Sequence, residues 1–434
     1  MAMNRIQIVS ASRRIELKEL ASRSHQVVIL AACAGAITGL FVAGFDRLVI
    51  DVGLDHVLQL RPWLIALMPG AGLLLALLAR RTIAPTAGPG TADEYLHAFH
   101  DPTHKLTWRP FVARIVAALA TLGSGNPMGL EGPSLYAGAT IGDRLQHHFP
   151  KLFRTSDRKV LLVAGAAAGV AAIFKAPATG AVFAMEVPYQ EDLARGMLLP
   201  ALVASGTGYL TFAAINGTNA LFPITGRSAF AMADILGAIA VGIIAGLGAR
   251  GFAKLLRTAK AIAAHPHPAL IAAAAGATIA ALYIAGRLLT GESLTVTSGY
   301  DVIAWASTPG RTIPILLAIL VLRSLTTTAS VAGGGVGGLF IPLVVAGALT
   351  GSVIGNVVDP KDLTMFVVIG VAAFLGAGYR VPLAAVMFVA ETTGRPSFIV
   401  PGLFAAVAAE LMMGTASVTK YQRHRNQPVP RSVH

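Results

Sequence analysis

Charged residues are scarce in this 434-residue sequence, and cysteine is nearly absent. Asp, Glu, Lys and Arg make up 13% of the chain, against about 25% in a typical soluble domain. This shortage excludes a soluble multidomain enzyme, and the lone Cys33 excludes an internal disulfide. With 55% hydrophobic residues, the composition indicates an all-α integral membrane protein that crosses the bilayer several times.

Basic residues outnumber acidic ones by 34 to 21, and many of them lie near the two ends of the chain. A nucleic-acid-binding protein would gather its cations on a soluble face, so we expect no nucleic acid partner. The positive-inside rule places ends that are rich in Lys and Arg in the cytoplasm. We therefore expect a multi-pass protein of the cell (inner) membrane, with both termini cytoplasmic and an even number of crossings.

The apolar stretches differ in length and are interrupted by glycine and proline, which number 46 and 24. A perpendicular helical crossing needs roughly 20 apolar residues, and several stretches are shorter. Tilted and broken helices fit better, and such breaks are tolerated where they line a cavity or pack inside protein. The clearest stretches are 27–50, 63–79, 111–123, 160–187, 197–214, 233–253, 268–289, 313–332, 338–357, 364–392 and 398–413.

Two pairs of segments indicate an internal repeat. Residues 161–187 and 366–392 share the order helix, aromatic-basic-X-Pro break, helix and terminal Glu, at a separation of 205 residues. Residues 129–142 and 338–351 align at a separation of 209 residues. Two such matches in the same order predict a two-fold repeat with a ligand site between its halves near the membrane midplane. The aligned pairs include Gly129/Gly338, Pro133/Pro342, Gly138/Gly347, Gly165/Gly370, Phe174/Tyr379, Lys175/Arg380, Phe183/Phe388 and Glu186/Glu391.

The repeat and the charged ends divide the chain into four expected parts. These are a cytoplasmic basic N-terminal segment (1–25), a first membrane half (26–215), a second membrane half (216–419) and a cytoplasmic basic tail (420–434).

Several ionisable residues outside the repeat breaks have simpler interpretations. We expect Glu186 and Glu391 to hydrogen-bond to helix ends or polar loops. Arg323 precedes a threonine run and could face water, where it would attract anions. The spacing of His97, His100 and His104 mimics a metal site, but no cysteine accompanies it. We expect no metal and no cofactor.

The segment 121–142 places a single carboxylate, Glu131, in a glycine-rich break between apolar stretches. An ionisable residue inside the membrane is expensive and is therefore a candidate functional residue. Glycines let consecutive N–H groups face a ligand, and a helix that we expect to start after Pro133 directs its positive dipole end to the same place. A second glycine break, 333–342, opens another helix with Phe340 in place of the acid. Together they predict an uncharged anion pathway with a titratable carboxylate plug.

These motifs resemble those of the CLC family of chloride channels and chloride/proton antiporters, and the resemblance covers about residues 25–420. The family's Gly-(Lys/Arg)-Glu-Gly-Pro motif appears as Gly129-Leu130-Glu131-Gly132-Pro133, and its Gly-x-Phe-x-Pro motif as Gly338-Leu339-Phe340-Ile341-Pro342. Its Gly-Ser-Gly-Ile-Pro motif is best matched by Gly88-Pro89-Gly90-Thr91-Ala92. The resemblance implies the CLC fold, an inverted two-fold repeat of tilted and broken helices, and a homodimer with one pathway per subunit.

The resemblance also implies roles for individual residues. Glu131 corresponds to the gating glutamate, which occupies an anion site when deprotonated and swings away when protonated. Anion-binding groups are then expected at Pro89, Gly132, Leu339, Phe340, Ile341, and either Thr419 or Tyr421.

Four positions depart from the family pattern. Leu130 replaces a basic residue beside the gate. At the position of Pro89, many chloride-selective members have Ser. Members that move nitrate have proline there, as this chain does. Val187 aligns with the internal proton-transfer glutamate of the antiporters, and a valine cannot relay protons. The inner-gate tyrosine aligns best with Thr419, with Tyr421 two residues out of register, and both carry a hydroxyl group.

The sequence thus predicts transport of chloride or a similar small anion through a glutamate-gated pathway, by a channel or a weakly proton-coupled exchanger. The alternative is a strict anion/proton antiporter for nitrate or fluoride. A more remote alternative is an intramembrane enzyme, which would need a nucleophile beside a base or a metal-binding histidine pair. The sequence has no HExxH motif, and Ser124 has no histidine near it in the chain. We expect no enzymatic activity and expect a small anion and membrane lipid as partners.

Overall fold

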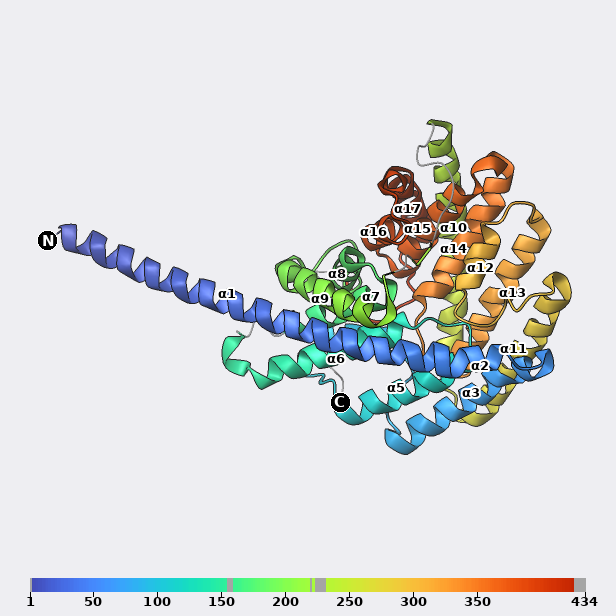
Figure 1. The fold of residues 1–434 in the computed structure, drawn as a ribbon, viewed down its shortest axis with the longest axis horizontal. Helices are drawn as coiled ribbons and strands as arrows, with labels where there is room; N and C mark the ends of the chain where they lie inside the picture. Colours follow the sequence, from blue (N-terminus) through green and yellow to red (C-terminus); the bar gives the residue numbers. More distant parts are fainter. Residues whose placement is uncertain (1, 154–158, 219–220, 223–231, 425–434) are drawn as a thin grey trace.

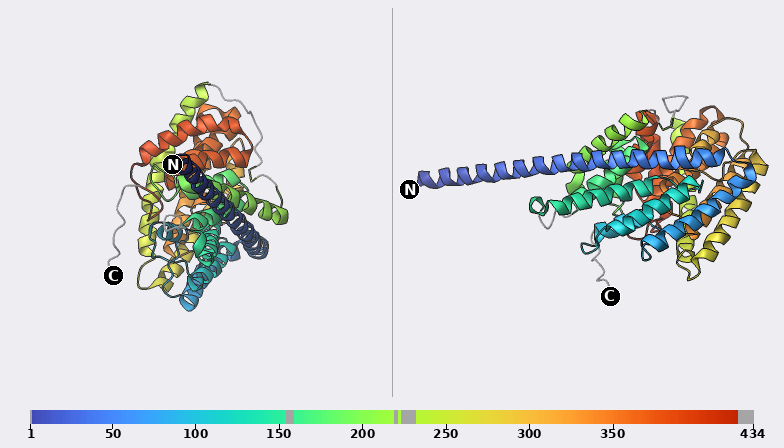
Figure 2. Two further views of the ribbon diagram at one scale, coloured as in Figure 1. Left: turned by 90° about the vertical axis from the view of Figure 1, so that its left-hand side faces the viewer. Right: turned by 60° about the horizontal axis from the view of Figure 1, so that its bottom comes forward.

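The computed structural model describes residues 2–153, 159–218, 221–222 and 232–424, with the backbone alone for residues 2–24, 151, 233 and 361. Helices pack side by side in one body, and the N-terminal part of α1 projects away from it (Figures 1 and 2). Within the described ranges there is no β-strand, only two isolated bridges. The last ten residues of the expected basic tail, 425–434, lie outside the described residues.

The first half of the chain forms nine α-helices in the described residues. A π-helical turn, Leu48–Leu54, continues α1, and 3₁₀ turns occur at Pro150–Leu152 and Arg195–Met197. The α-helices are α1 (Ala2–Arg47), α2 (Asp55–Leu58), α3 (Pro62–Ile83), α4 (Ala92–His100), α5 (Trp108–Gly123), α6 (Glu131–His148), α7 (Val160–Phe174), α8 (Pro177–Glu186) and α9 (Leu198–Asn216).

The second half adds eight α-helices in the described residues, with 3₁₀ turns at Pro360–Asp362 and Pro396–Phe398. They are α10 (Met232–Ile262), α11 (Pro268–Thr290), α12 (Tyr300–Ala306), α13 (Ile313–Ala332), α14 (Phe340–Val358), α15 (Leu363–Tyr379), α16 (Pro382–Thr393) and α17 (Ile399–Met413).

Eight helical segments of the described chain are long and apolar enough to cross a membrane. In seven of them no more than 44% of the most apolar window is buried inside the protein, whereas in α14 the fraction is 78%. The helices α7 and α8 are short, at 15 and 10 residues. The prediction of a multi-pass helical membrane protein with broken helices is confirmed. The crossing segments are His25–Leu58, Pro62–Ile83, Arg195–Asn216, Asp234–Ile262, Pro268–Thr290, Ile313–Ala332, Phe340–Val358 and Pro396–Met413.

The two predicted Pro breaks have the same local structure. Lys175 ends α7 and Arg380 ends α15, both in the left-handed conformation with φ of 53° and 57°. Left-handed residues commonly end helices, because they let the following N–H groups bond back to the last carbonyls. Pro177 and Pro382 then occupy the first position of the next helix, where a missing N–H leaves no hydrogen bond unmade.

The repeat pairs observed in the sequence also make equivalent helix contacts. A Cβ added to Gly138 of α6 would lie 2.0 Å from the carbonyl oxygen of Gly165 in α7. In the second half, a Cβ on Gly347 of α14 would lie 2.3 Å from the carbonyl oxygen of Gly370 in α15. Only glycine allows backbones to approach this closely. The prediction of a two-fold repeat is confirmed.

The terminal glutamates of the repeat each cap the helix of the other half. The Glu391 carboxylate, at the end of α16, accepts hydrogen bonds from the N–H groups of Ala178 and Thr179 at 2.9 and 2.6 Å. The Glu186 carboxylate, at the end of α8, accepts from the N–H groups of Leu383 and Ala384 at 3.1 and 2.8 Å. Because each helix ends beside the start of the other, α8 and α16 are antiparallel, as an inverted repeat requires. The expected hydrogen bonding to helix ends is confirmed.

Arg323 has a structural role that the sequence did not indicate. Its side chain is 2% exposed, and its guanidinium donates hydrogen bonds to the carbonyl oxygens of Leu294, Val296 and Thr297. The idea that Arg323 faces water was therefore wrong. It fixes the loop before α12 against α13, and the carbonyl dipoles of that loop stabilise its positive charge.

Candidate functional site

The two glycine-rich breaks meet directly. Gly129 N–H donates to the carbonyl oxygen of Gly338 at 3.0 Å, and Gly338 N–H donates to that of Gly129 at 2.6 Å. These residues are repeat partners, so the pseudo-two-fold axis passes between them. The reciprocal bonds bring the first turns of α6 and α14 face to face, with the positive ends of both helix dipoles at one place.

The carboxylate of Glu131 lies inside this junction. Its side chain is 3% exposed, and Oε1 accepts a hydrogen bond from the Phe340 N–H at 2.7 Å. The N–H group of Ile341 faces the same carboxylate, and Oε2 has no hydrogen-bond partner. A Cβ on Gly129 would lie 1.8 Å from Oε2, and one on Gly338 would lie 1.9 Å from Oε1. The missing side chains of these glycines leave the space that the carboxylate occupies.

Aromatic rings surround the second-half turn of this junction. The ring centroid of Phe340 lies 4.3 Å from that of Phe174 and 4.9 Å from that of Phe388. Phe183 and Tyr379 complete the collar at 5.4 and 6.3 Å. Phe174 and Tyr379 are repeat partners, and so are Phe183 and Phe388. Each half of the chain therefore contributes two of these four rings. Apolar walls lower the local dielectric and strengthen the hold of the backbone dipoles on a negative charge.

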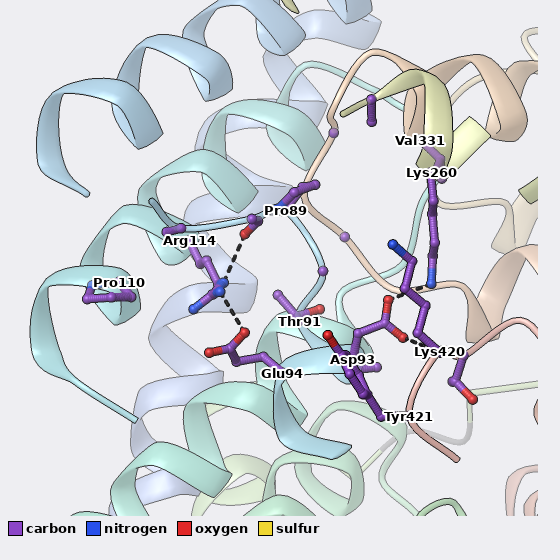
Figure 3. A pocket seen from close by; sticks show the side chains of 18 of the residues that line it. Pro89, Thr91, Asp93, Glu94, Pro110, Arg114, Lys260, Val331, Lys420 and Tyr421 are labelled. Carbon is purple, nitrogen blue, oxygen red and sulfur yellow. Dashed lines mark hydrogen bonds and ion pairs between the residues drawn. The ribbon is translucent and has the colours of Figure 1, made fainter. Parts of the chain in front are cut away.

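A cavity of about 640 Å³ leads to this junction (Figure 3). The loop before α4, the glycine turn that precedes α14 and the segment 418–421 line it, together with cationic side chains. It therefore brings together anion-site candidates from three distant parts of the sequence. The sequence-predicted residues among its lining are Gly88, Pro89, Gly90, Gly338, Leu339, Thr419 and Tyr421.

The charges of this cavity are mostly paired. Arg114 donates to the Glu94 carboxylate at 2.8 Å and to the carbonyl oxygen of Gly88 at 3.0 Å, which fixes the loop that carries Pro89 (Figure 3). Lys260 lies 2.6 Å from the carboxylate of Asp93. The cavity thus has a cationic rim, and Arg80 also donates to the carbonyl oxygen of Gly334, early in the second glycine break, at 3.3 Å.

The two candidates for an inner-gate hydroxyl both line the cavity but differ in their partners. The Thr419 hydroxyl lies 2.9 Å from that of Ser417. The Tyr421 ring is stacked on His97 at 4.8 Å between centroids, and His97 is stacked on His104 at 4.1 Å.

Within the described chain, no group of three or more His, Cys, Asp and Glu side chains could hold a metal ion.

Two hydroxyl groups near the junction were missed by the sequence reasoning. Tyr379 is buried, and its hydroxyl interacts with the N–H of Leu339. Thr91 follows the Gly-Pro-Gly turn and is also buried. Tyr379 could have been noticed, because its repeat partner Phe174 differs from it by one hydroxyl. Thr91 gave no signal, since a threonine before a helix usually caps that helix.

Two positions that depart from the family pattern are buried and apolar. Leu130 is 3% exposed beside the junction, and Val187 is 1% exposed at the end of α8. Neither side chain carries a group that can bind or transfer a proton. The acid next to Val187, Glu186, is engaged with the start of α16 as described above.

Comparisons with known proteins agree with this geometry. A family model described as voltage gated chloride channel matches residues 71–414. The chain is 26% identical over 428 residues to the H⁺/Cl⁻ exchange transporter ClcA of Salmonella typhimurium, with 94% of this chain and 90% of that protein covered. The same values apply to ClcA of Salmonella typhi.

Solved structures show the same fold. A slow cyanobacterial Cl⁻/H⁺ antiporter matches with a TM-score of 0.78 and 21% identity, covering 89% of this chain and 94% of that one. A CLC-type fluoride/proton antiporter matches with a TM-score of 0.79 and 20% identity, covering 92% and 98%. With a family model that matches most of its length, this chain belongs to the voltage-gated chloride channel (CLC) family of membrane proteins.

Proposed function

We propose that this protein moves chloride or a similar small anion across the membrane through a pathway gated by Glu131, as a channel or a weakly proton-coupled exchanger. One observation carries the proposal. The Glu131 carboxylate sits at two facing helix starts and accepts a hydrogen bond from the Phe340 N–H. A carboxylate and a small anion need the same donors, so each excludes the other.

The junction suits transit rather than tight retention. Its donors are backbone N–H groups of Gly132, Leu339, Phe340 and Ile341 and the ends of two helix dipoles, without a full positive charge. An anion held by partial charges binds strongly enough to enter and weakly enough to leave. When Glu131 is protonated, its negative charge is lost, the side chain leaves the donors, and the anion takes its place.

Weak proton coupling is supported by the inner end of α8. In many antiporters that this chain resembles, an internal glutamate transfers the proton on the side opposite the gate, although some antiporters lack it, and Val187 cannot take that role. The neighbouring Glu186 carboxylate accepts hydrogen bonds from two N–H groups at the start of α16. To carry a proton it would have to give up these bonds, which cap that helix. A strict anion/proton antiporter for nitrate or fluoride is the alternative, because proteins similar to this one are named as proton-coupled exchangers.

We place the protein in the cell (inner) membrane as a homodimer, with both termini cytoplasmic and the large cavity on the side of the C-terminal segment. The basic ends support this orientation through the positive-inside rule. The chain is organised as a basic segment (1–25), two membrane halves (26–215 and 216–419) and a basic tail (420–434). It acts as a transporter and not as an enzyme.

Reconstitution in liposomes tests this function. With chloride inside and an impermeant anion outside, valinomycin and K⁺ balance the charge, and chloride efflux and external pH are recorded together. We expect chloride efflux with little proton uptake. Proton uptake in fixed proportion to chloride, nitrate or fluoride would favour the strict antiporter. No efflux of any of the three anions above that of empty liposomes would overturn the proposal.

A further inference from the structure

We propose that the Thr91 hydroxyl donates a hydrogen bond to the transported anion at the cavity end of the helix junction, and so takes over the role of the serine that Pro89 replaces. The inference rests on the proposed function and adds a selectivity residue to it. The ligand is a small monovalent anion of the halide or nitrate type.

The position of Thr91 in the chain suggests a different use, which the structure does not show. Thr91 is the N-cap residue of α4, where a threonine hydroxyl normally accepts from an N–H of the first turn. Here its backbone is helical, with φ of −92° and ψ of −50°, and the side chain makes no capping hydrogen bond. The hydroxyl is therefore not needed by its own helix.

The Thr91 hydroxyl is directed toward the junction instead. A Cβ placed on Gly132 would lie 2.6 Å from Thr91 Oγ1 and 3.0 Å from the backbone nitrogen of Gly338. The hydroxyl thus lies against the first turn of α6, beside the turn that precedes α14. Figure 3 shows Thr91 in the middle of the cavity lining, between the Arg114–Glu94 pair and the Asp93–Lys260 pair.

Burial makes this unused hydroxyl costly. Thr91 is 2% exposed, and its Oγ1 has no hydrogen-bond partner. A buried hydroxyl without a partner is unfavourable, whereas valine has the same shape and would avoid that cost. A partner that comes and goes, such as a transported anion, accounts for a hydroxyl that the protein's own groups leave unpaired.

Pro89 explains why a donor is needed at this position. Proline has neither a side-chain donor nor an N–H group, so the Gly-Pro-Gly turn offers nothing from its middle residue. Thr91 follows two residues later on the same turn and lines the same cavity. The hydrogen bond from Arg114 to the Gly88 carbonyl oxygen fixes this loop. The Thr91 hydroxyl is therefore already in place, and the loop does not have to become ordered each time an anion passes.

The test compares Thr91→Val, Thr91→Ser and a matched control, Thr82→Val. Thr82 is exposed on α3, and its hydroxyl bonds only to its own helix. Chloride binding to the purified protein is measured by calorimetry, and chloride efflux is measured in liposomes. A hydrogen bond to a charged partner such as chloride is stronger than one between neutral groups, so Thr91→Val should bind chloride more weakly by roughly 10- to 150-fold. Thr91→Ser, which keeps the hydroxyl, and Thr82→Val should remain close to the unchanged protein.

The outcomes separate the two proposals. If the unchanged protein transports chloride and Thr91→Val binds it equally well, the inference on Thr91 is wrong and the proposed function stands. If the unchanged protein transports no anion, the proposed function itself fails. Should Thr91→Val not purify as folded protein, Thr91→Ala removes the same hydroxyl and is held to the same loss of roughly 10- to 150-fold.

Discussion

Removing the Glu131 carboxylate should open the pathway, and the structure sets the size of the effect. Oε1 accepts one well-formed hydrogen bond, from the Phe340 N–H at 2.7 Å. A hydrogen bond to a charged group contributes about 1.5–3 kcal/mol. Because 1.4 kcal/mol corresponds to tenfold, a gating carboxylate held by this bond would disfavour anion entry by a factor of about 10 to 150. We expect Glu131→Ala to raise passive chloride efflux, and the apparent affinity for chloride, by a factor in this range.

Glu131→Gln should give a smaller increase. The amide is neutral but keeps one carbonyl oxygen that can accept from Phe340, at about 0.5–1.5 kcal/mol for an uncharged bond. In both variants the dependence of efflux on pH should disappear. In the unchanged protein, efflux should rise as the pH falls, because protonation removes the charge that competes with the anion. Glu292→Gln, which changes an exposed carboxylate in the loop after α11, is the matched control.

The assay is chloride efflux from liposomes over a range of external pH, with chloride affinity measured in parallel by calorimetry. Efflux from the Glu131 variants that keeps the pH profile of the unchanged protein would refute the assignment of this residue as the gate. Equal chloride affinity in Glu131→Ala and the unchanged protein would contradict the claim that the carboxylate and the anion share donors.

Three further changes give independent tests. Pro89→Ser adds a hydroxyl to the middle of the turn and should shift the preference from nitrate toward chloride by about two- to tenfold; identical permeability ratios would remove Pro89 as a selectivity element. Glu391→Gln weakens the cap of α8 and should lower the melting temperature in detergent, by the equivalent of about 1–3 kcal/mol, and an unchanged melting temperature would contradict this role. The hydrogen bond to Glu94 raises the pKa of His104 above 6.5, so its contribution to stability is complete below pH 6.5 and is lost as the pH rises through the raised value. His104→Gln should flatten the melting temperature over that window, and a profile parallel to that of the unchanged protein would count against it.

The repeat could be predicted from the sequence because both copies kept the residue types that the geometry requires. Gly129 and Gly338 align in the sequence and meet in the structure through reciprocal hydrogen bonds. Gly138 and Gly347 each allow the close approach of a neighbouring helix. Such positions accept only glycine, so both halves have glycine at the same spacing, and this spacing can be recognised in the sequence.

The partners of individual side chains could not be predicted in this way. Arg323 binds carbonyl groups of a loop about thirty residues before it in the chain, and any backbone could have supplied them. Thr91 resembles an ordinary helix cap in the sequence, and only the conformation of its backbone shows that it does not act as one. The choice between Thr419 and Tyr421 depends on how the C-terminal segment enters the cavity, for which the sequence carries no periodic signal.

The exchange of caps between α8 and α16 has a consequence for biosynthesis. The amides of Ala178 and Thr179 leave the ribosome 213 and 212 residues before the carboxylate of Glu391 that accepts from them. Until that residue is synthesised and inserted, the start of α8 has bare donors in an apolar surrounding. A nascent chain stopped after its first half therefore lacks the acceptor for these two N–H groups, so the start of α8 is completed only when the second half has been inserted.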